Sequence, residues 1–563
     1  MVSGLFGTAR ELPRLREISV VLVRHGLGDL LRRAGVAPLL ETAGFVLQWV
    51  EDPGLAQLEM PQRARLAFEQ LGPTFVKLGQ ILSTREDLLP PAWTSEMAQL
   101  HSHVAPVAFE QLLPQVEQAL GCSPFEVFTQ LEREPYAAAS IAQVHRAKLA
   151  NGTPVVLKIR RPGIEPKIDA DLRILDYLAQ LVEREIPELR RYRPTQILGE
   201  LRRSLERELD LVVEARSTER FAHNFAGDLN ILVPRVYWEW TSSTMNVQEH
   251  IEGIRGNDAA GIELAGLDRK ALAARGVDAV LKMILIDGFF HADPHPGNLI
   301  FLPGNRIAFI DFGMAGRLSP TRRRQLVDLL AGLVRHDEEA MLEVLLEWRG
   351  DDAVDESRLA ADLGEFAFDY ADRSLKDLRI APLLHRVSAI LREHSIVLPT
   401  DLTLLFKALM TLDGLGRRYD PDFRLIDRVQ PFIERGMRER YQPVEAARRA
   451  QHTLGELFGL VTSMPRDFAR LIRDAREGRL RIDLDLKRLD HFATRLHTAV
   501  DRATMGIMTA SLVVGSSIVM TVTGGPRVFG ISLLTWCGLV GYLVAFGNSL
   551  WIIFSMWRAS RRR

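Results

Sequence analysis

The chain has 563 residues, which is long enough for two or three folded units with cores of their own. Its 71 lysines and arginines nearly balance 72 aspartates and glutamates, so no overall field favours nucleic acid as a partner. The two cysteines, Cys122 and Cys537, form no C-x-x-C pair and do not support a disulfide framework or a cysteine zinc site. The first twenty residues carry charges where a signal peptide needs an apolar run, so we expect no secretion.

Residues 1–130 are expected to form an N-terminal helical extension, because apolar residues recur there at helical spacing. Within it, LGPTFVKLGQILSTREDLLP places Lys77 and Gln80 on one face of an apolar helix. By pattern alone this also fits a plain amphipathic helix whose lysine reaches solvent along its apolar stem.

Residues 131–254 have the strand pattern of a kinase small lobe. YAAASIAQVHRAKLANGTPVVLKI predicts a strand, a turn of small residues, a second strand, an Asn-Gly hairpin and a strand ending on Lys158. Lys158 then has the position of the lysine that pairs the α- and β-phosphates. Kinases place glycines where this turn has Ala137, Ala138, Ala139 and Ser140. Because alanine resists positive φ, nucleotide binding is expected to be altered in geometry but not lost.

Residues 165–224 are expected to be helical, with Glu208, Asp210 and Glu214 on adjacent turns. Three acids on a helix also fit a solvated face, but the lysine upstream makes Glu214 the candidate to hold it. VPRVYWEWTSSTMNVQEHIEGI then predicts two strands and a hinge, so that Glu249 and its neighbours to residue 251 would line an adenine pocket through backbone groups.

The stretch 287–313, DGFFHADPHPGNLIFLPGNRIAFIDFG, predicts a loop, a β-hairpin and a carboxylate after the returning strand. Its H-x-D-x-x-x-x-N followed by D-F-G matches the catalytic and metal loops of kinases in order and spacing. Asp293 would orient or deprotonate the attacking hydroxyl, while Asn298 and Asp311 would hold magnesium. The alternatives are two turns that merely contain aspartate and a metal site at His291 and His295. We expect these histidines to brace the loop by hydrogen bonds.

Residues 255–440 predict a large lobe of amphipathic helices. After D-F-G the chain runs directly into a helix capped near Ser319, without a long activation segment or an A-P-E motif. A protein kinase uses that segment to dock an extended peptide, so its absence argues against ordinary protein substrates.

The C-terminal part is expected to contain a helical connector, residues 441–502, and two transmembrane helices within residues 503–557. Residues 503–526 and 528–557 each lack charge and exceed the about 20 apolar residues that span a bilayer. Gly-Gly-Pro at 524–526 predicts the turn, and the flanking arginines place both ends and the soluble part in the cytoplasm. A buried hairpin of a soluble protein is the alternative.

Five motifs occur together and in order: Lys77-Leu78-Gly79-Gln80, the alanine loop, ELDLVVEA, HADPHPGN and DFG. This set resembles the UbiB (AarF/ABC1-like) family of atypical kinases over about residues 60 to 420. The two closing apolar runs resemble its bacterial branch, which implies a location in the bacterial inner membrane. The resemblance implies an α+β, bilobal protein-kinase-like fold, with the N-terminal extension over the active site and a transmembrane hairpin at the C-terminus.

The same resemblance implies the site residues and the ligands. It implies regulatory positions at Lys77, Gln80, Glu208 and Asp210, an ion pair of Lys158 with Glu214, a catalytic acid at Asp293, and metal ligands at Asn298 and Asp311. ATP and magnesium are the implied cofactors. Membrane lipids and quinone intermediates are the implied partners, with other quinone-biosynthesis proteins, and we expect no nucleic acid. Family members show ATPase activity linked to lipid binding and support ubiquinone biosynthesis.

Two other functions remain open from the sequence. A small-molecule kinase of the aminoglycoside or choline type also places a histidine near the catalytic aspartate and an asparagine after it. A nucleotide-sensing scaffold would bind ATP without turnover, although the intact Asp293, Asn298 and Asp311 argue weakly against it. Phosphate release with and without anionic lipid distinguishes these functions.

Overall fold

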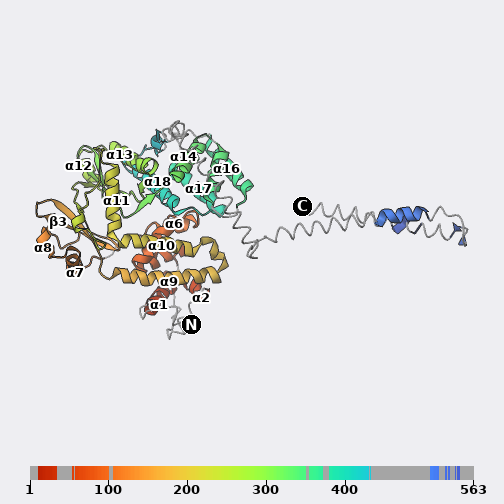
Figure 1. The fold of residues 1–563 in the computed structure, drawn as a ribbon, viewed down its shortest axis with the longest axis horizontal. Coiled ribbons are helices and arrows are strands. Elements are labelled where there is room, and N and C mark those ends of the chain that lie inside the picture. Colours follow the sequence, from red (N-terminus) through yellow and green to blue (C-terminus); the bar gives the residue numbers. More distant parts are fainter. Residues whose placement is uncertain are drawn as a thin grey trace, which may run out of the picture. The chain divides into compact units, whose positions relative to one another are not determined.

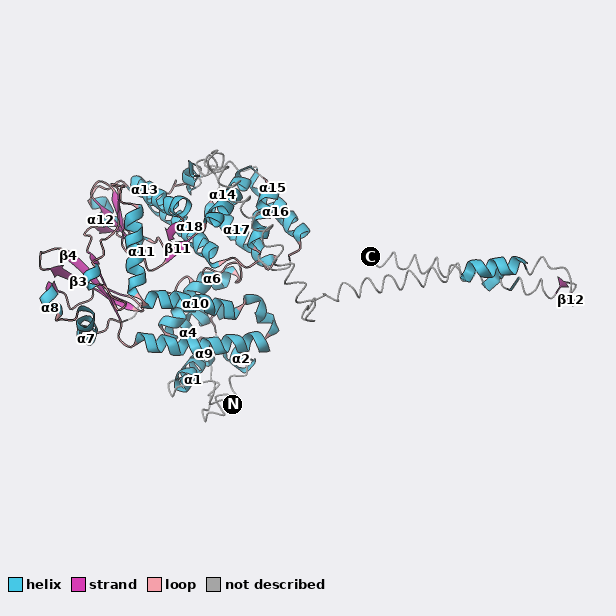
Figure 2. Ribbon diagram, viewed as in Figure 1, coloured by secondary structure: helices cyan, strands magenta, loops and turns pink. Residues whose placement is uncertain are grey.

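The computed structural model of the chain forms two compact units, Met1–Ala446 and Ala447–Arg563. The residues that the structure describes are 11–33, 54–55, 57–100, 105–335, 337–349, 354–371, 379–425, 427–429, 431–432, 508–518, 527–528, 531–532, 539–540 and 542–544. The predicted connector, residues 441–502, lies outside them. The N-terminal unit contains a sheet, a helical layer and a second lobe, which Figures 1 and 2 show.

The small lobe is built on an antiparallel sheet in the order β1-β3-β4-β6, with β2 paired to β3. Its strands are β1 (Phe128–Leu131), β2 (Ala137–Ala138), β3 (Ala142–Leu149), β4 (Pro154–Arg160) and β6 (Met245–Glu249). The Asn-Gly hairpin is confirmed, because Gly152 has φ of 82° and the Asn151 side chain accepts from the Thr153 N–H. One face of the sheet packs on α7 (Phe109–Leu120), so this helix shares its core with the sheet. Two strands were predicted before the hinge. The first of them forms only a single antiparallel β-bridge, between Val236 and Gln248.

The N-terminal helices pack with two helices of the predicted small lobe into one layer (Figure 1). The layer contains α1 (Glu11–Arg24), α2 (Gly28–Arg33), α4 (Met60–Leu71), α5 (Pro73–Leu82), α6 (Pro91–Met97), α9 (Ile164–Glu185) and α10 (Pro194–Leu209). Buried ion pairs join its parts: Arg14 Nε lies 2.7 Å from an oxygen of Asp171, and Arg85 pairs with both Asp87 and Glu200. This layer positions α5, which carries the KLGQ motif.

The helix predicted through ELDLVVEA is interrupted. α10 ends at Leu209 and α11 (Leu211–Asn224) begins after Asp210, whose extended backbone places it between the two helices. The Asp210 carboxylate accepts a hydrogen bond from the Val212 N–H at 3.1 Å, which is the geometry of an N-cap. Glu208 and Glu214 therefore belong to different helices, and the expectation of one continuous helix was wrong because the cap stabilises a break that periodicity does not show.

The large lobe combines a four-stranded sheet, β5-β10-β9-β7, a two-stranded pair, β11-β8, and a group of helices. Its strands are β5 (Ile231–Leu232), β7 (Ile254–Arg255), β8 (Phe289–His291), β9 (Leu299–Leu302), β10 (Arg306–Phe309) and β11 (Ala315–Arg317). Its helices are α12 (Ala259–Leu264), α13 (Arg269–Lys282), α14 (Pro320–Arg335), α15 (Glu338–Trp348), α16 (Glu356–Ala371), α17 (Ile380–Glu393) and α18 (Thr400–Tyr419). The predicted β9–β10 hairpin and the cap at Ser319, whose hydroxyl accepts from the Arg322 N–H, are confirmed.

Only short pieces of the C-terminal unit are described. Residues 508–518 are helical, and β12 (Arg527–Val528) pairs antiparallel with β13 (Ile531–Ser532) just after the predicted turn. The hydroxyls of Ser517 and Tyr542, one from each apolar run, lie 2.8 Å apart. Among the described residues, no helix has the length and apolar character needed to cross a membrane. Most of the predicted hairpin lies outside those residues.

Candidate active site

Three charged side chains from separate elements of the two lobes meet. The Lys158 ammonium, on β4, donates to both oxygens of Glu214, on α11, at 2.8 Å. It also lies 3.7 Å from an oxygen of Asp311, which follows β10. Burial alone would lower the pKa of Lys158, but the charges of Asp311 and Glu214 outweigh it and raise that pKa. Lys158 is therefore a permanently charged group, and the ion pair expected from the sequence is present.

The D-F-G loop is held by its backbone and by the packing of its phenylalanine. Asp311 accepts a hydrogen bond from the Gly313 N–H at 2.9 Å, and the charge of Lys158 holds the pKa of Asp311 below its ordinary value. Phe312 is buried and stacks on Phe221 of α11, with ring centroids 4.5 Å apart. This packing joins the metal loop to the helix that carries Glu214, so the carboxylate of Asp311 faces the lysine.

Both histidines of the catalytic loop act as backbone braces. His291 Nδ1 accepts from the Asp293 N–H at 3.1 Å, and His295 Nδ1 accepts from the Gly297 N–H at 3.0 Å. Burial lowers the pKa of His291 to about 4, so its ring is neutral near pH 7. The Asn298 side-chain N–H donates to the Asp293 carbonyl at 3.3 Å. These bonds fix the relative positions of the predicted catalytic acid and the predicted metal ligand.

Lys407 is a site residue that the sequence did not reveal. Its ammonium lies 3.3 Å from a carboxylate oxygen of Asp293, although it comes from the middle of α18. Nothing in the pattern of α18 distinguishes this lysine from an ordinary charge on an amphipathic helix. Only the packing of α18 against the catalytic loop brings the two together.

The KLGQ motif reaches the same centre. Lys77 is buried and forms an ion pair with Glu208, while Gln80 lines a cavity on the same side of the helix. Burial, together with the charge of Lys407, lowers the pKa of Lys77 to about 8, although the charges of Asp293 and Asp311 oppose the shift. Ala292 and Gly313, which adjoin the two predicted acidic loops, line the same cavity as Lys77. Asp210, for which the resemblance implies a regulatory position like that of Glu208, is the N-cap of α11.

The predicted turn of small residues is shorter than expected, because Ala137 and Ala138 form β2 and only residues 139–141 connect it to β3. The Ala139 N–H donates to the Ala142 carbonyl at 2.9 Å, as a turn of small residues requires. Arg161, which no sequence pattern indicates, is buried and donates from Nε to the Ala139 carbonyl at 3.0 Å and from a terminal nitrogen to the Ala105 carbonyl. The Arg161 guanidinium thus anchors the backbone of the connection at Ala139 and limits its movement.

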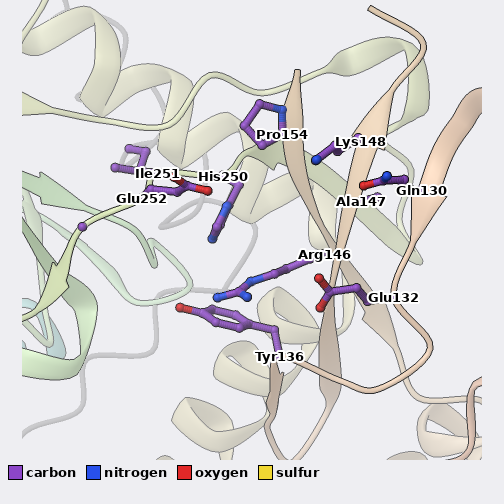
Figure 3. Close-up of a pocket in the computed structure, with 11 residues that line it drawn as sticks. Gln130, Glu132, Tyr136, Arg146, Ala147, Lys148, Pro154, His250, Ile251 and Glu252 are labelled. Atoms are coloured by element: carbon purple, nitrogen blue, oxygen red, sulfur yellow. The ribbon is translucent and has the colours of Figure 1, made fainter. Parts of the chain in front are cut away.

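The predicted hinge borders a cavity of about 310 Å³, the hinge cavity, which Figure 3 shows. His250 and Ile251 line it, whereas the Glu249 side chain accepts from the Arg235 N–H at 3.2 Å. Tyr136, which precedes the alanine loop, points into the cavity beneath Arg146, whose guanidinium lies 4.0 Å from the ring centroid. Burial would raise the pKa of Tyr136, but hydrogen bonds from Arg255 and Arg146 outweigh it and lower that pKa.

The oxygen donors around Asp311 fit magnesium shared with a phosphate. Within the described ranges no cluster of three or more His, Cys, Asp or Glu forms a self-contained metal site. Magnesium commonly takes one or two protein oxygens and completes its shell with phosphate and water. One carboxylate and one amide, from Asp311 and Asn298, meet this requirement.

Comparisons with known proteins identify the family to which the chain belongs. Family models match residues 99–345 as "ABC1 atypical kinase-like domain", residues 363–424 as "UbiB helical domain" and residues 487–558 as "ABC1/UbiB kinase-like C-terminal domain". A Pseudomonas paraeruginosa protein named "Probable protein kinase UbiB" is 36% identical over 470 residues, covering 81% of this chain and 86% of that protein. A Xanthomonas campestris pv. campestris protein of the same name is 35% identical over 516 residues, covering 88% and 92%.

Among solved structures, Rv3197 from Mycobacterium tuberculosis, in complex with erythromycin, aligns with a TM-score of 0.40 and 20% identity. That alignment covers 70% of this chain and 99% of Rv3197, and the TM-score is too low to support an inference. The family assignment rests on the sequence relatives, which match most of both chains at more than a third identity. With its kinase-like fold, this chain belongs to the UbiB (ABC1) family of atypical kinases.

Proposed function

We propose that this chain is a membrane-anchored atypical kinase or ATPase that binds magnesium-ATP between its lobes and supports ubiquinone biosynthesis. The observation that carries the proposal is the cluster of Lys158, Glu214 and Asp311, formed from three elements beside the loop of Asp293 and Asn298. Phosphoryl transfer depends on positioning and charge stabilisation, and this cluster supplies both.

In the proposed reaction, Lys158 binds the phosphates and Glu214 holds its ammonium in place. Asn298 and Asp311 would hold magnesium, which when bound neutralises charge on the β- and γ-phosphates. Asp293 orients the acceptor, which is water or the hydroxyl of a small lipid-like molecule. Lys407 sets the position of the Asp293 carboxylate.

The substrate class follows from what covers the site. Lys77 and Gln80 lie beside the catalytic centre, which restricts the entry of bulky peptides. β11 leads directly to α14, so no extended activation segment is present to dock a peptide. We therefore propose membrane lipids and quinone intermediates as the molecules handled, with extraction of lipids or organisation of other quinone-biosynthesis proteins as the use of ATP.

The membrane location is supported by the two uncharged runs, 503–526 and 528–557, and by the arginines that flank them. The contact of Ser517 with Tyr542 and the β12–β13 pair are consistent with antiparallel runs. The role in ubiquinone biosynthesis is supported by the family to which the relatives named UbiB belong. We propose that the anchor holds the cytoplasmic catalytic part at the bacterial inner membrane.

Phosphate release from the purified full-length protein tests the proposal, measured with magnesium-ATP in the presence and absence of anionic lipid vesicles. Asp293→Asn should lose turnover and keep ATP binding, whereas Asp311→Asn should lose the magnesium dependence of binding. Asp169→Asn, an exposed aspartate on α9, is the matched control and should behave as wild type.

Absence of turnover under every lipid condition would contradict the enzyme and favour a scaffold, and phosphorylation of an aminoglycoside or choline would favour a small-molecule kinase. For the quinone role, disruption of the gene should lower quinone content, and an Asp311→Asn copy should not restore it.

A further inference from the structure

A second cavity, of about 500 Å³, lies beside the catalytic centre, and we name it the arginine cavity. Its walls come from α5, α10, α11, β11 and the start of α18. Ile81, Val213, Phe289 and Leu404 contribute apolar surface to it. Such a wall suits a ligand with an apolar body, because burying that body removes apolar surface from water.

Four arginines also line the arginine cavity: Arg203 and Arg207 from α10, Arg220 from α11 and Arg317 from β11. In the part of the chain that the structure describes, none of the four forms an ion pair with a carboxylate. Arg220 instead lies over the ring of Phe289, with its guanidinium carbon 4.6 Å from the centroid. These guanidiniums therefore remain available to bind an anion.

The carboxylates on the cavity wall do not neutralise these arginines, because they already have other partners. Glu200 accepts from Arg85 at 3.0 Å and from the Thr400 hydroxyl at 2.9 Å. Asp401 lies 3.6 Å from Arg322. The arginine cavity consequently carries an excess of positive charge, which favours a doubly charged anion over a single carboxylate.

The path of the chain explains why this part of it supplies no anion to pair with the four arginines. In protein kinases, arginines pair with a phosphorylated residue of the activation segment and order it. Here β11 is followed at once by α14, so this part of the chain supplies no such segment. A phosphate that reaches these arginines has to come from another molecule.

We propose that the arginine cavity binds an amphiphile with a phosphate head, the head held by the arginines and the apolar body held against Ile81, Val213 and Leu404. Guanidinium groups bind phosphate through paired N–H donors, and the apolar wall selects against phosphate that carries no hydrocarbon. Binding here requires neither ATP nor magnesium, since no residue of the Lys158 cluster touches the head.

Calorimetry on the full-length protein in nanodiscs, without nucleotide or magnesium, tests this site with three water-soluble probes: hexyl phosphate, inorganic phosphate and hexanol. Hexyl phosphate should bind at least about tenfold more tightly than either of the others, because only it satisfies both parts of the cavity. Equal affinity for inorganic phosphate would reduce the site to one for free phosphate and overturn the amphiphile assignment. Equal affinity for hexanol would show that the arginines contribute nothing.

Charge-removing variants locate the probe. Arg220→Gln with Arg317→Gln should weaken hexyl phosphate binding by about tenfold or more, while Arg216→Gln, on α11 but outside the cavity lining, should not. Melting temperatures of the variants should match wild type, since both altered arginines are exposed. Lys158→Gln should also leave the affinity unchanged. Loss of binding in that variant would place the probe at the nucleotide site and overturn the proposal, whether or not the chain turns over ATP.

Discussion

Lys407 and Asp293 form an ion pair at 3.3 Å between the helical part of the large lobe and the catalytic loop. The carboxylate that we propose to orient the acceptor is therefore positioned from two sides. His291 accepts from the backbone N–H of Asp293, and Lys407 contacts its side chain. The loop alone would leave the carboxylate free to rotate.

Lys407→Met should lower ATP turnover by about tenfold or more, because the Asp293 carboxylate loses the cation that orients it. ATP affinity should change little, since Lys158 and Asp311 are untouched. Initial rates of phosphate release, with calorimetry for ATP, measure the two effects separately. Lys270→Met, at an exposed lysine of α13, is the control. Wild-type turnover in Lys407→Met would remove this lysine from the site.

Gly79→Ala should destabilise the fold by about 1–3 kcal/mol, because a small-to-large change in a packed core forces its neighbours apart. A Cβ at Gly79 would lie 2.0 Å from Leu100 Cδ1 and 3.1 Å from Phe68 Cδ2. Gly414→Ala is the matched control. Gly414 also lies within a helix, α18, but a Cβ there would meet nothing within 4 Å. The Gly414→Ala variant should be more stable by about 0.5–1 kcal/mol, because alanine loses less backbone entropy than glycine on folding. Thermal unfolding of both variants tests the contrast, which equal melting temperatures would refute.

Asp210→Ala should cost about 1 kcal/mol of stability through loss of the cap on α11. Asp210→Asn should preserve most of it, because the amide oxygen can still accept from the Val212 N–H. Chemical unfolding compares the two variants. If Asn were as damaging as Ala, the charge of Asp210 would matter and capping would not account for its presence.

The buried His291 should make the stability of the protein depend on pH between about 4 and about 6.5. Its folded-state pKa is about 4, whereas the unfolded value is about 6.5. In this window the unfolded chain binds more protons, so stability falls as the pH is lowered, by up to about 1.4 kcal/mol per pH unit.

The His291→Gln variant should lose this contribution. The melting-temperature gap between wild type and variant should therefore narrow as the pH falls from 6.5 towards 4. His223→Gln, at an exposed histidine of α11, should follow the wild-type profile. A constant gap for His291→Gln would mean that His291 does not titrate in this range.

Local patterns were enough to predict the elements that carry the site, whereas the α+β kinase-like fold was implied by the resemblance of the motifs to a known family. The β9–β10 hairpin, the Asn-Gly turn and the cap at Ser319 each depend on a few neighbouring residues, and each is confirmed. The pair of Lys158 with Glu214 was also found, because a known order of motifs connects them. The break at Asp210 was missed, since a capping aspartate inside a periodic stretch looks like a helix residue.

The amino-acid sequence by itself determined the family, the order of the motifs and the identity of the charged groups at the candidate active site. Only the tertiary structure decided which distant groups meet them: Lys407 at Asp293, Arg161 behind the alanine loop, and four arginines around one cavity. The physical reason is that hydrophobic periodicity reports which face of a helix is buried, but not which neighbour covers it. The sequence pattern around a lysine or arginine on a helix is the same whether the side chain faces water or a carboxylate from a distant part of the chain.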